Sequence, residues 1–287
     1  LHAILLVDHG DDAQGRERRI LLQFVYGRCS LTVAIPVLSA MGHQCCPIPT
    51  AILSNHTEFP VYFFDDYTEK MTTYTDKWKE LGLSFDAIAT GFLGSEAQIG
   101  IVMEIVQKLK AEKTFVVVDP VMGDHGHAYE TYTPEMCEQM KELVCMADVV
   151  LPNVTECCIL TDTPYREENW TRKELLNMAM MLRLMGAKSV VITGVREGSC
   201  YTNVVLEQGQ YDAKFIRTRS SGGERPGTGD VFSSVVAGAL LNGKSLPEAV
   251  SQAAGFVKEC IKVSDEEQIP HANGVCFEKI LGKLIKK

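Results

Sequence analysis

The sequence predicts an α/β protein with three layers, α/β/α, in which helices cover both faces of a mostly parallel central sheet. Short apolar runs alternate with segments of helical periodicity along most of the 287 residues. That alternation is typical of parallel strands joined by crossover helices. The last third of the chain is all helical in pattern, and the length suits one large domain of this class.

Each element follows from its own pattern in the chain. Runs of apolar, often β-branched residues predict strands at Ile20–Val25, Gln44–Leu53, Ala87–Thr90, Thr114–Asp119, Val149–Leu151, Ser189–Thr193, Cys200–Leu206 and Tyr211–Arg217. Apolar residues at helical spacing predict helices at Thr68–Glu80, Glu96–Lys110, Pro134–Cys145, Asn153–Leu160, Thr171–Met185, Gly229–Leu241, Pro247–Val263 and Gly274–Ile285. We expect residues 20–287 to form one domain, and Leu1–Arg19, which precedes the first strand, to be a flexible or non-native arm.

Composition excludes several classes of protein. Hydrophobic residues make up 46% of the chain and charged residues 23%, which is typical of a globular protein. The formal net charge of −9 disfavours sequence-independent binding to the phosphates of nucleic acid. No apolar run approaches the roughly 18–20 residues of a membrane helix, and Ala3–Val7 is too short for a signal peptide. We therefore expect a cytoplasmic protein with no nucleic-acid or membrane partner.

The ten cysteines are spread through the chain and form no C-x-x-C motif. A disulfide framework is the alternative, but it belongs to small secreted domains. Buried, reduced thiols are the prediction that fits this chain.

The sharpest local motif is Gly227-Thr-Gly-Asp230, directly before the apolar helix Val231–Leu241. Two glycines at the start of a helix let several backbone N–H groups converge, and the helix dipole adds positive charge there. This combination predicts an anion hole. Asp230 beside it is either a simple N-cap or a general base that accepts the proton of an attacking hydroxyl during phosphoryl transfer.

A second polar motif is Asn153-x-x-Glu156, directly after the strand that ends at Leu151. The spacing fits a capping box at the start of the next helix. It also fits a shell for hydrated Mg²⁺, which keeps several waters and takes few carboxylates. The residues alone leave both interpretations open.

A third motif, Asp119-Pro-Val-Met-Gly123, ends a buried strand and continues into a glycine-containing loop that reaches Tyr129. His125 and His127 could ligate zinc, but no third ligand stands at a recognisable spacing. A mobile cover over a cleft fits the glycines better.

Two further stretches, Leu53-Ser-Asn-His-Thr57 with Glu58 and Thr90-Gly-Phe-Leu-Gly-Ser95, each follow a strand. Hydroxyl, amide and imidazole groups beside an aromatic ring suit a small heteroaromatic ligand, although each stretch alone could be a turn. The chain contains no G-x-x-x-x-G-K-[ST] loop, so a kinase would need a different phosphate site.

Together these motifs resemble the ribokinase superfamily. The order of Tyr26-Gly-Arg-Cys-Ser30, Leu53–Thr57, Gly91-Phe-Leu-Gly-Ser95 and Asp119–Gly123 is similar to that of the vitamin B6 kinases, the pyridoxal and pyridoxamine kinases. The resemblance runs from about Ile20 to the C-terminal helices. It implies a ribokinase-like fold and transfer of the γ-phosphoryl group of ATP to the 5′-hydroxymethyl group of pyridoxal, pyridoxamine or pyridoxine.

The resemblance also implies roles for single residues. Asp230 would be the catalytic base, and the anion hole would be formed by Gly227, Thr228 and Gly229. ATP and its phosphates would be bound by Asp119, Asn153, Glu156 and Thr193, and Mg²⁺ would be held through water by Asp119 and Glu156. Substrate would be bound by Tyr26, Thr57, Glu58, Phe92 and Asp230. Similar enzymes are usually homodimers; whether a monovalent cation assists stays open.

Some features depart from the family pattern. Gln23–Tyr26 is shorter than the corresponding segment of such kinases, and Thr193-Gly194 stands where some relatives place a lysine near ATP. Arg217, Arg219 and Arg225 are candidates to balance the phosphate charge instead. Two alternatives therefore remain: a kinase of hydroxymethylpyrimidine or another small alcohol, and a binding protein for the vitamer that has no catalytic activity.

Overall fold

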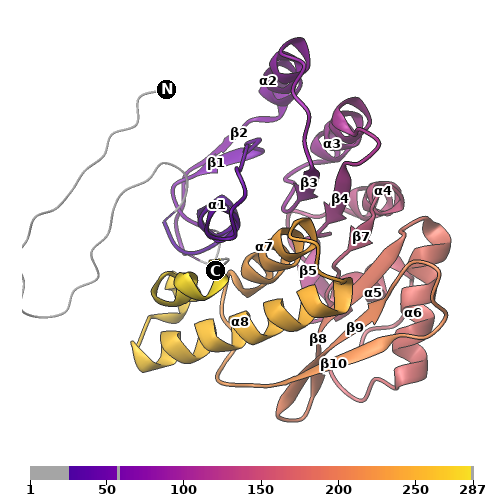
Figure 1. Ribbon diagram of the computed structural model, residues 1–287, viewed down its shortest axis with the longest axis vertical. Helices are drawn as coiled ribbons and strands as arrows, with labels where there is room; N and C mark the ends of the chain where they lie inside the picture. Colours follow the sequence, from indigo (N-terminus) through magenta and orange to yellow (C-terminus); the bar gives the residue numbers. More distant parts are fainter. Residues whose placement is uncertain (1–25, 57–58, 286–287) are drawn as a thin grey trace, which may run out of the picture.

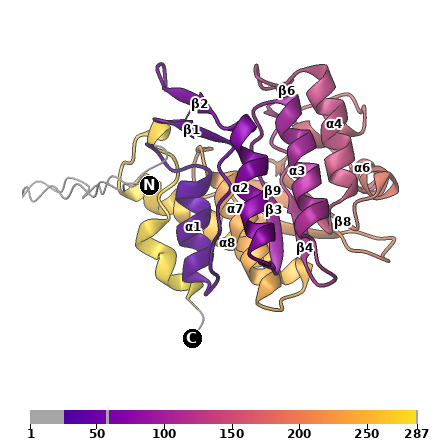
Figure 2. The ribbon, with the colours of Figure 1, turned by 90° about the horizontal axis from the view of Figure 1, so that it is seen from above.

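In the computed structural model of the chain, a six-stranded sheet lies between two layers of helices (Figures 1 and 2). The structure describes residues 26–56 and 59–285. The predicted arm Leu1–Arg19 and the predicted strand Ile20–Val25 therefore lie outside the described residues, as do Thr57 and Glu58. The predicted three-layer α/β architecture is confirmed.

The sheet has the strand order β10-β9-β8-β7-β4-β3. The strands are β3 (Ala87–Thr90), β4 (Phe115–Val118), β7 (Val149–Val150), β8 (Ser189–Glu197), β9 (Cys200–Leu206) and β10 (Lys214–Arg219). β3, β4, β7 and β8 are parallel, whereas β9 and β10 continue the sheet as an antiparallel meander. The carboxyl ends of the four parallel strands thus meet at one edge, where ligands of open α/β sheets bind.

Alternating side chains of the strands build two separate cores. Val116 and Val118 of β4 face one core, and Val117 between them faces the other. The first core lies against α2 (Thr68–Glu80), α3 (Glu96–Leu109), α4 (Pro134–Cys145), α5 (Val154–Leu160) and α6 (Arg172–Met185), and the second lies against α1 (Leu31–Ala40), α7 (Thr228–Leu241) and α8 (Leu246–Glu266). A strand with both faces buried carries an uninterrupted apolar run, and this is why the sequence signal of the strands was strong.

Two small hairpins stand apart from the sheet. β1 (Ala51–Leu53) pairs with β2 (Phe64–Asp66), and β5 (Gly123–Asp124) pairs with β6 (His127–Ala128). The predicted strand Gln44–Leu53 is therefore wrong over most of its length. Its prolines at 47 and 49 lack the N–H that a strand ladder needs. β2 was not predicted, because its residues are exposed and carry no alternating pattern.

Helix α1 was also missed. Its sequence is apolar almost throughout and contains Pro36, so it shows neither a polar face nor an uninterrupted helical run. At the other end of the chain, the predicted helix Gly274–Ile285 is instead a 3₁₀ helix, η2 (Glu278–Leu284), that follows the short η1 (His271–Asn273). The yellow C-terminal turns lie beside the indigo α1 in Figure 1.

The ten cysteines are free thiols, but only Cys157, Cys158, Cys260 and Cys276 are buried. The prediction of buried thiols thus holds for four of the ten positions. Among the described residues, no helix is both long and apolar enough to cross a membrane.

Candidate active site

Polar residues from three parallel strands meet at the carboxyl edge of the sheet. Asp119 follows β4, Asn153 follows β7, and Thr193 lies in β8 beside Asn153. The Thr193 backbone N–H donates to the Pro152 carbonyl oxygen at 2.8 Å, which fixes the two loops against each other. The parallel register therefore assembles residues that are far apart in the sequence.

Helix α7 begins at this edge with Gly227 as its N-cap. Gly227 has φ 80°, and a Cβ atom there would lie 2.0 Å from the Arg28 carbonyl oxygen, so only glycine fits. Because the N-cap residue has no side chain, no side-chain cap occupies the first N–H groups of the helix. Gly229 is exposed, with open space where its side chain would be. Such a helix start suits an anion.

Asp230 lies in the first turn of α7 and is half-buried. Burial raises the pKa of its carboxyl group, while the Ser30 backbone N–H and the nearby His56 side chain act in the opposite direction. A carboxylate whose pKa is raised is a better proton acceptor near neutral pH. The N-cap of the helix is Gly227 and not Asp230, so the simple capping role is not what this geometry shows.

Asp119 faces Asp230 across the end of the sheet. Burial and the neighbouring Asp230 charge raise the pKa of Asp119 to about 8, against a hydrogen bond from the Ser233 hydroxyl that lowers it. Ser233 lies one turn after Asp230 on the same helix face. Two carboxyl groups that repel each other in a partly buried site would be stabilised by a bound cation.

Glu156 is 3% exposed and both of its carboxyl oxygens accept backbone hydrogen bonds. Oε2 accepts from the Asn153 N–H at 2.7 Å and Oε1 from the Met122 N–H at 3.1 Å. The capping box with Asn153 is thus present. Burial and then the neighbouring Asp119 charge raise the pKa of Glu156 well above its usual value. A capping box alone does not need a second carboxyl group such as Asp119 close to Glu156.

The donor set at this edge fits a divalent cation that binds together with phosphates. Asp119 and Glu156 supply two crowded carboxyl groups, and Mg²⁺ in phosphate sites uses few protein ligands. Within the described part of the chain, no group of three His, Cys, Asp or Glu side chains is arranged to hold a metal by itself. His125 instead lies 3.3 Å from Glu224, so the zinc alternative gains no support.

The hairpin of β5 and β6 covers this edge. The hairpin is fixed to α5 at both its base and its turn. At the base, Asn153 Nδ2 donates to the Gly123 carbonyl oxygen at 2.8 Å, and in the turn the Gly126 N–H donates to the Thr155 hydroxyl at 2.9 Å. At its tip, His125 contacts Glu224 in the loop before Gly227. The sequence predicted a mobile cover over a cleft, whereas the structure fixes this hairpin to α5 at its base and its turn.

Aromatic rings gather around His56, whose side chain is near Asp230. Tyr26 packs edge-on against Phe59 with ring centroids 5.5 Å apart, and the Phe59 and His56 ring centroids are 4.7 Å apart. Phe92 follows β3 and is half-buried against the first core. A flat heteroaromatic ligand would find stacking partners there.

Some expectations about single residues need correction, and other residues were missed. Arg225 does not face the phosphate site: its guanidinium group bonds Asp265 at 2.8 Å and the Ile269 carbonyl oxygen at 2.9 Å. Ser233 could have been found from its spacing after Asp230. The role of the Ser30 N–H could not be predicted, because nearly every residue has a backbone N–H and residue identity does not show which one is used.

Tyr129 is a further neighbour of the site. Burial, and then the charges of Glu156, Asp124, Asp119 and Asp230, raise the pKa of its phenol, so it stays protonated. The sequence placed Tyr129 at the end of the covering loop without assigning it a role.

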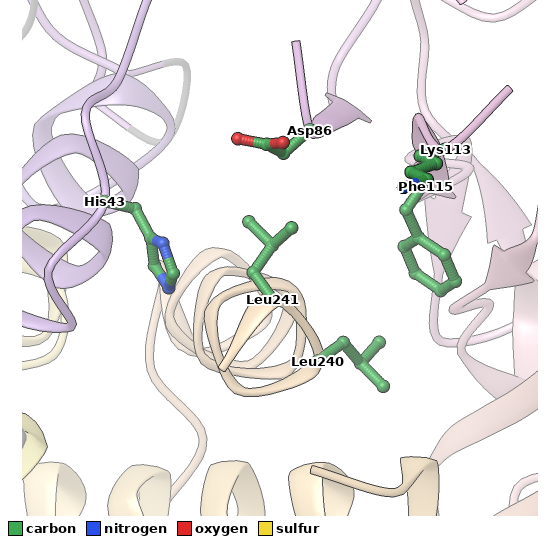
Figure 3. A pocket seen from close by; sticks show the side chains of 6 residues that line it. All are labelled: His43, Asp86, Lys113, Phe115, Leu240 and Leu241. Atoms are coloured by element: carbon green, nitrogen blue, oxygen red, sulfur yellow. The ribbon is translucent and has the colours of Figure 1, made fainter. Parts of the chain in front are cut away.

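The two described cavities lie elsewhere. One, of about 390 Å³, is lined by His43, Asp86, Lys113, Phe115, Leu240 and Leu241, at the amino ends of β3 and β4 and the last turn of α7 (Figure 3). The other, of about 550 Å³, lies between α4, α5 and the turn of the β5–β6 hairpin, and its lining includes Gly126 and Tyr165. Neither is lined by Asp119 or Asp230, so the reacting groups lie outside both.

Comparisons with known proteins agree with this arrangement. Residues 35–276 match the phosphomethylpyrimidine kinase family. A protein described as a candidate phosphomethylpyrimidine kinase from Bacteroides thetaiotaomicron is 37% identical, with a TM-score of 0.89 and 92% of each chain covered. In a second crystal form, with pyridoxal, the corresponding values are 38% and 0.86, with 91% of this chain and 93% of that chain covered. The pyridoxine/pyridoxal/pyridoxamine kinase of Bordetella avium is 27% identical over 86% of each chain. The chain belongs to the phosphomethylpyrimidine kinase family and, within it, to the ribokinase-like pyridoxal kinases.

Proposed function

We propose that this protein transfers the γ-phosphoryl group of ATP to the 5′-hydroxymethyl group of pyridoxal, pyridoxamine or pyridoxine. The observation that carries the proposal is the position of Asp230, in the first turn of the helix that begins at Gly227 and near His56 with its neighbouring aromatic ring. A hydroxymethyl group on a stacked ring would there meet a base and an anion site together. The similarity to kinases of B6 vitamers, one of them crystallised with pyridoxal, supports this substrate class.

In the mechanism, Asp230 accepts the proton of the hydroxyl as it attacks the γ-phosphorus. Its raised pKa makes this transfer favourable near neutral pH. The backbone N–H groups of Gly227, Thr228 and Gly229 stabilise the charge on the phosphoryl group during transfer. The half-burial of Asp230 strengthens both interactions, because water screens them less.

ATP is the phosphoryl donor of this kinase family, and we assign its phosphates to Asn153, Thr193 and the neighbouring loops. Asp119 and Glu156 would hold Mg²⁺, directly or through water. When bound, Mg²⁺ neutralises phosphate charge. The two backbone N–H groups that bond Glu156 orient its carboxyl group.

For the substrate ring we propose Tyr26 and Phe92 as stacking residues. Thr57 and Glu58 remain the expected polar contacts on the pyridine side; they lie outside the described residues. A requirement for a monovalent cation would be tested by comparing turnover in potassium and in tetramethylammonium salts.

The second candidate substrate is hydroxymethylpyrimidine, which the matched family's description favours. Both compounds carry a hydroxymethyl group on a heteroaromatic ring, so Asp230 could serve either. A coupled assay of ADP formation with pyridoxal, pyridoxamine, pyridoxine, hydroxymethylpyrimidine and ribose separates them. We expect the highest kcat/KM with a B6 vitamer; a higher value with hydroxymethylpyrimidine or ribose would contradict the proposal.

A binding protein without catalysis was the alternative of another class. The family membership and the Asp230 geometry support an enzyme instead. In the assay above, ADP formation by the wild-type protein that disappears in Asp230→Ala would exclude the binder.

We further propose that residues 20–287 act as one domain, that the enzyme works in the cytoplasm and that it is a homodimer. The exposed apolar run Val61–Phe64 beside β1 supports the dimer, since these side chains are 44–79% exposed. Light scattering after size-exclusion chromatography should give twice the mass of the 31.7 kDa chain. The mass of a single chain would refute the dimer.

A further inference from the structure

A C-terminal segment, Ala272–Glu278, packs against three parts of the active site. We call it the C-terminal brace. Its Ala272 carbonyl oxygen lies 2.8 Å from His56 Nε2, and its Val275 N–H donates to the Pro226 carbonyl oxygen at 3.1 Å, directly before Gly227. Gly274 forms a parallel bridge with Arg28. The brace thus touches the loops that carry the proposed base, the anion site and the substrate rings.

Arg28 makes the polar side-chain contacts between the brace and the N-terminal loop. Its Nε lies 2.7 and 3.0 Å from the two carboxyl oxygens of Glu278, and its Nη1 donates to the Asn273 carbonyl oxygen at 3.3 Å. The Arg28 side chain is only 15% exposed. A guanidinium group that donates to several acceptors holds a fixed geometry, which a lysine ammonium cannot reproduce.

The same loop reaches Asp230 two residues later. The Ser30 backbone N–H lies near the Asp230 carboxyl group and lowers the pKa of that group, and Ser30 adopts φ 49° and ψ −127°. A non-glycine residue in this conformation is strained and persists only where its surroundings hold it. Thr32 holds the loop on one side, since its hydroxyl accepts from the Cys29 N–H at 3.2 Å. Arg28 holds it on the other side.

We propose that Arg28, anchored by Glu278 and Asn273, is a positioning residue for catalysis. It keeps the Ser30 N–H directed at Asp230 and so orients the carboxylate that receives the hydroxyl proton. The Arg28 backbone carbonyl oxygen also lies against Gly227: a Cβ atom added at Gly227 would be only 2.0 Å from it. The inference rests on the proposed function of Asp230, and it makes the C-terminal brace part of the catalytic framework.

The test compares three variants with the wild-type enzyme. Arg28→Met removes the guanidinium group but keeps much of the apolar stem, and Arg28→Lys keeps the charge. Glu267→Gln is the matched control: it removes the 2.6 Å ion pair between Glu267 and Lys279, the residue after Glu278, and this pair does not involve the active-site loops.

We expect Arg28→Met to lower kcat at least tenfold while KM for ATP and for pyridoxal changes less than threefold. Arg28→Lys, whose ammonium group cannot reproduce these contacts, should recover only a small part of the lost kcat, and Glu267→Gln should stay within twofold of wild type. Because the Glu267–Lys279 ion pair is about half-exposed and adds little stability, the melting temperature of Glu267→Gln should stay within about 4 °C of wild type. The Arg28 side chain is mostly buried, so the melting temperatures of both Arg28 variants are measured to show that they are folded at the assay temperature. Arg28→Met with kcat within twofold of wild type, or Glu267→Gln with an equal loss, would overturn the inference.

A second measurement does not depend on turnover. Hydrogen exchange of the backbone amides in residues 26–40 should be faster in Arg28→Met, at the Ser30 amide above all, and unchanged in Glu267→Gln. Unchanged exchange at Ser30 in Arg28→Met would refute the positioning role. If the wild-type enzyme phosphorylated no B6 vitamer, the proposed function would fail, whereas the exchange experiment would still decide whether Arg28 holds the Ser30 amide.

Discussion

Gly227 allows a quantitative test of the anion site, through the substitution Gly227→Ala. Two effects of the new methyl group can be separated. Alanine at φ 80° costs about 1–2 kcal/mol, because its Cβ atom crowds the backbone in the left-handed region. At roughly 2–4 °C per kcal/mol, this effect alone lowers the melting temperature by roughly 2–8 °C.

The second effect is displacement. The new Cβ atom would lie 2.0 Å from the Arg28 carbonyl oxygen, and real Cβ atoms stay beyond 3.0 Å, so one of the two loops must move by 1.0 Å (3.0 minus 2.0) or more. Both loops contact groups that we assign to catalysis. A misplacement of about 1 Å can cost about 100-fold in rate, so we expect kcat to fall by about that factor.

Gly243→Ala is the matched control. Gly243 has φ 82° and lies just beyond the other end of α7, but nothing lies within 4 Å of its would-be Cβ atom. Gly243→Ala should therefore lower the melting temperature as Gly227→Ala does, but it should leave kcat unchanged. kcat is measured by the ADP-coupled assay at saturating pyridoxal and ATP. If Gly227→Ala kept a kcat within threefold of that of Gly243→Ala, the displacement argument would be wrong.

The other predictions concern the three acids. Asp230→Asn should lower kcat by about 10²–10⁴ while ATP still binds in calorimetry; near-normal turnover would remove Asp230 as the base. Glu156→Gln should raise the Mg²⁺ concentration needed for half-maximal rate, and an unchanged metal dependence would count against a metal role. The raised pKa of Asp119, about 8, means that the folded protein holds this proton while the unfolded chain releases it from about pH 4 upward. In Mg²⁺-free buffer the wild-type melting temperature should therefore fall, relative to Asp119→Asn, as the pH rises towards 8; a difference that does not vary with pH would contradict this.

Sequence patterns predicted best those elements that the rest of the fold does not alter. Helices α2 and α4 and strand β3 begin and end where the pattern placed them. α4, for example, carries a Thr133 N-cap, Pro134 in its first turn and one apolar face, and each of these signals is local. The motifs Asp119–Gly123, Asn153-x-x-Glu156 and Gly227–Asp230 were equally local.

Elements that depend on distant partners were predicted poorly. Helix α1 packs against α7 and the C-terminal turns, and its sequence is apolar on nearly every side, so it lacks the contrast between an apolar and a polar face that marks a helix in a sequence. β2 exists only through its antiparallel pairing with β1. Neither neighbour can be inferred from the residues of the element itself.

The sequence by itself determined the fold class, the family and the residue types that could carry the chemistry, because strand and helix periodicity and short motifs are properties of neighbouring residues. Only the tertiary structure decided what surrounds each of them. It turned Arg225 towards α8, brought Asp119 and Asp230 close enough to raise the pKa of Asp119, and directed the Ser30 amide at Asp230. These properties arise from burial and from through-space charge, and both depend on residues that lie far apart along the chain.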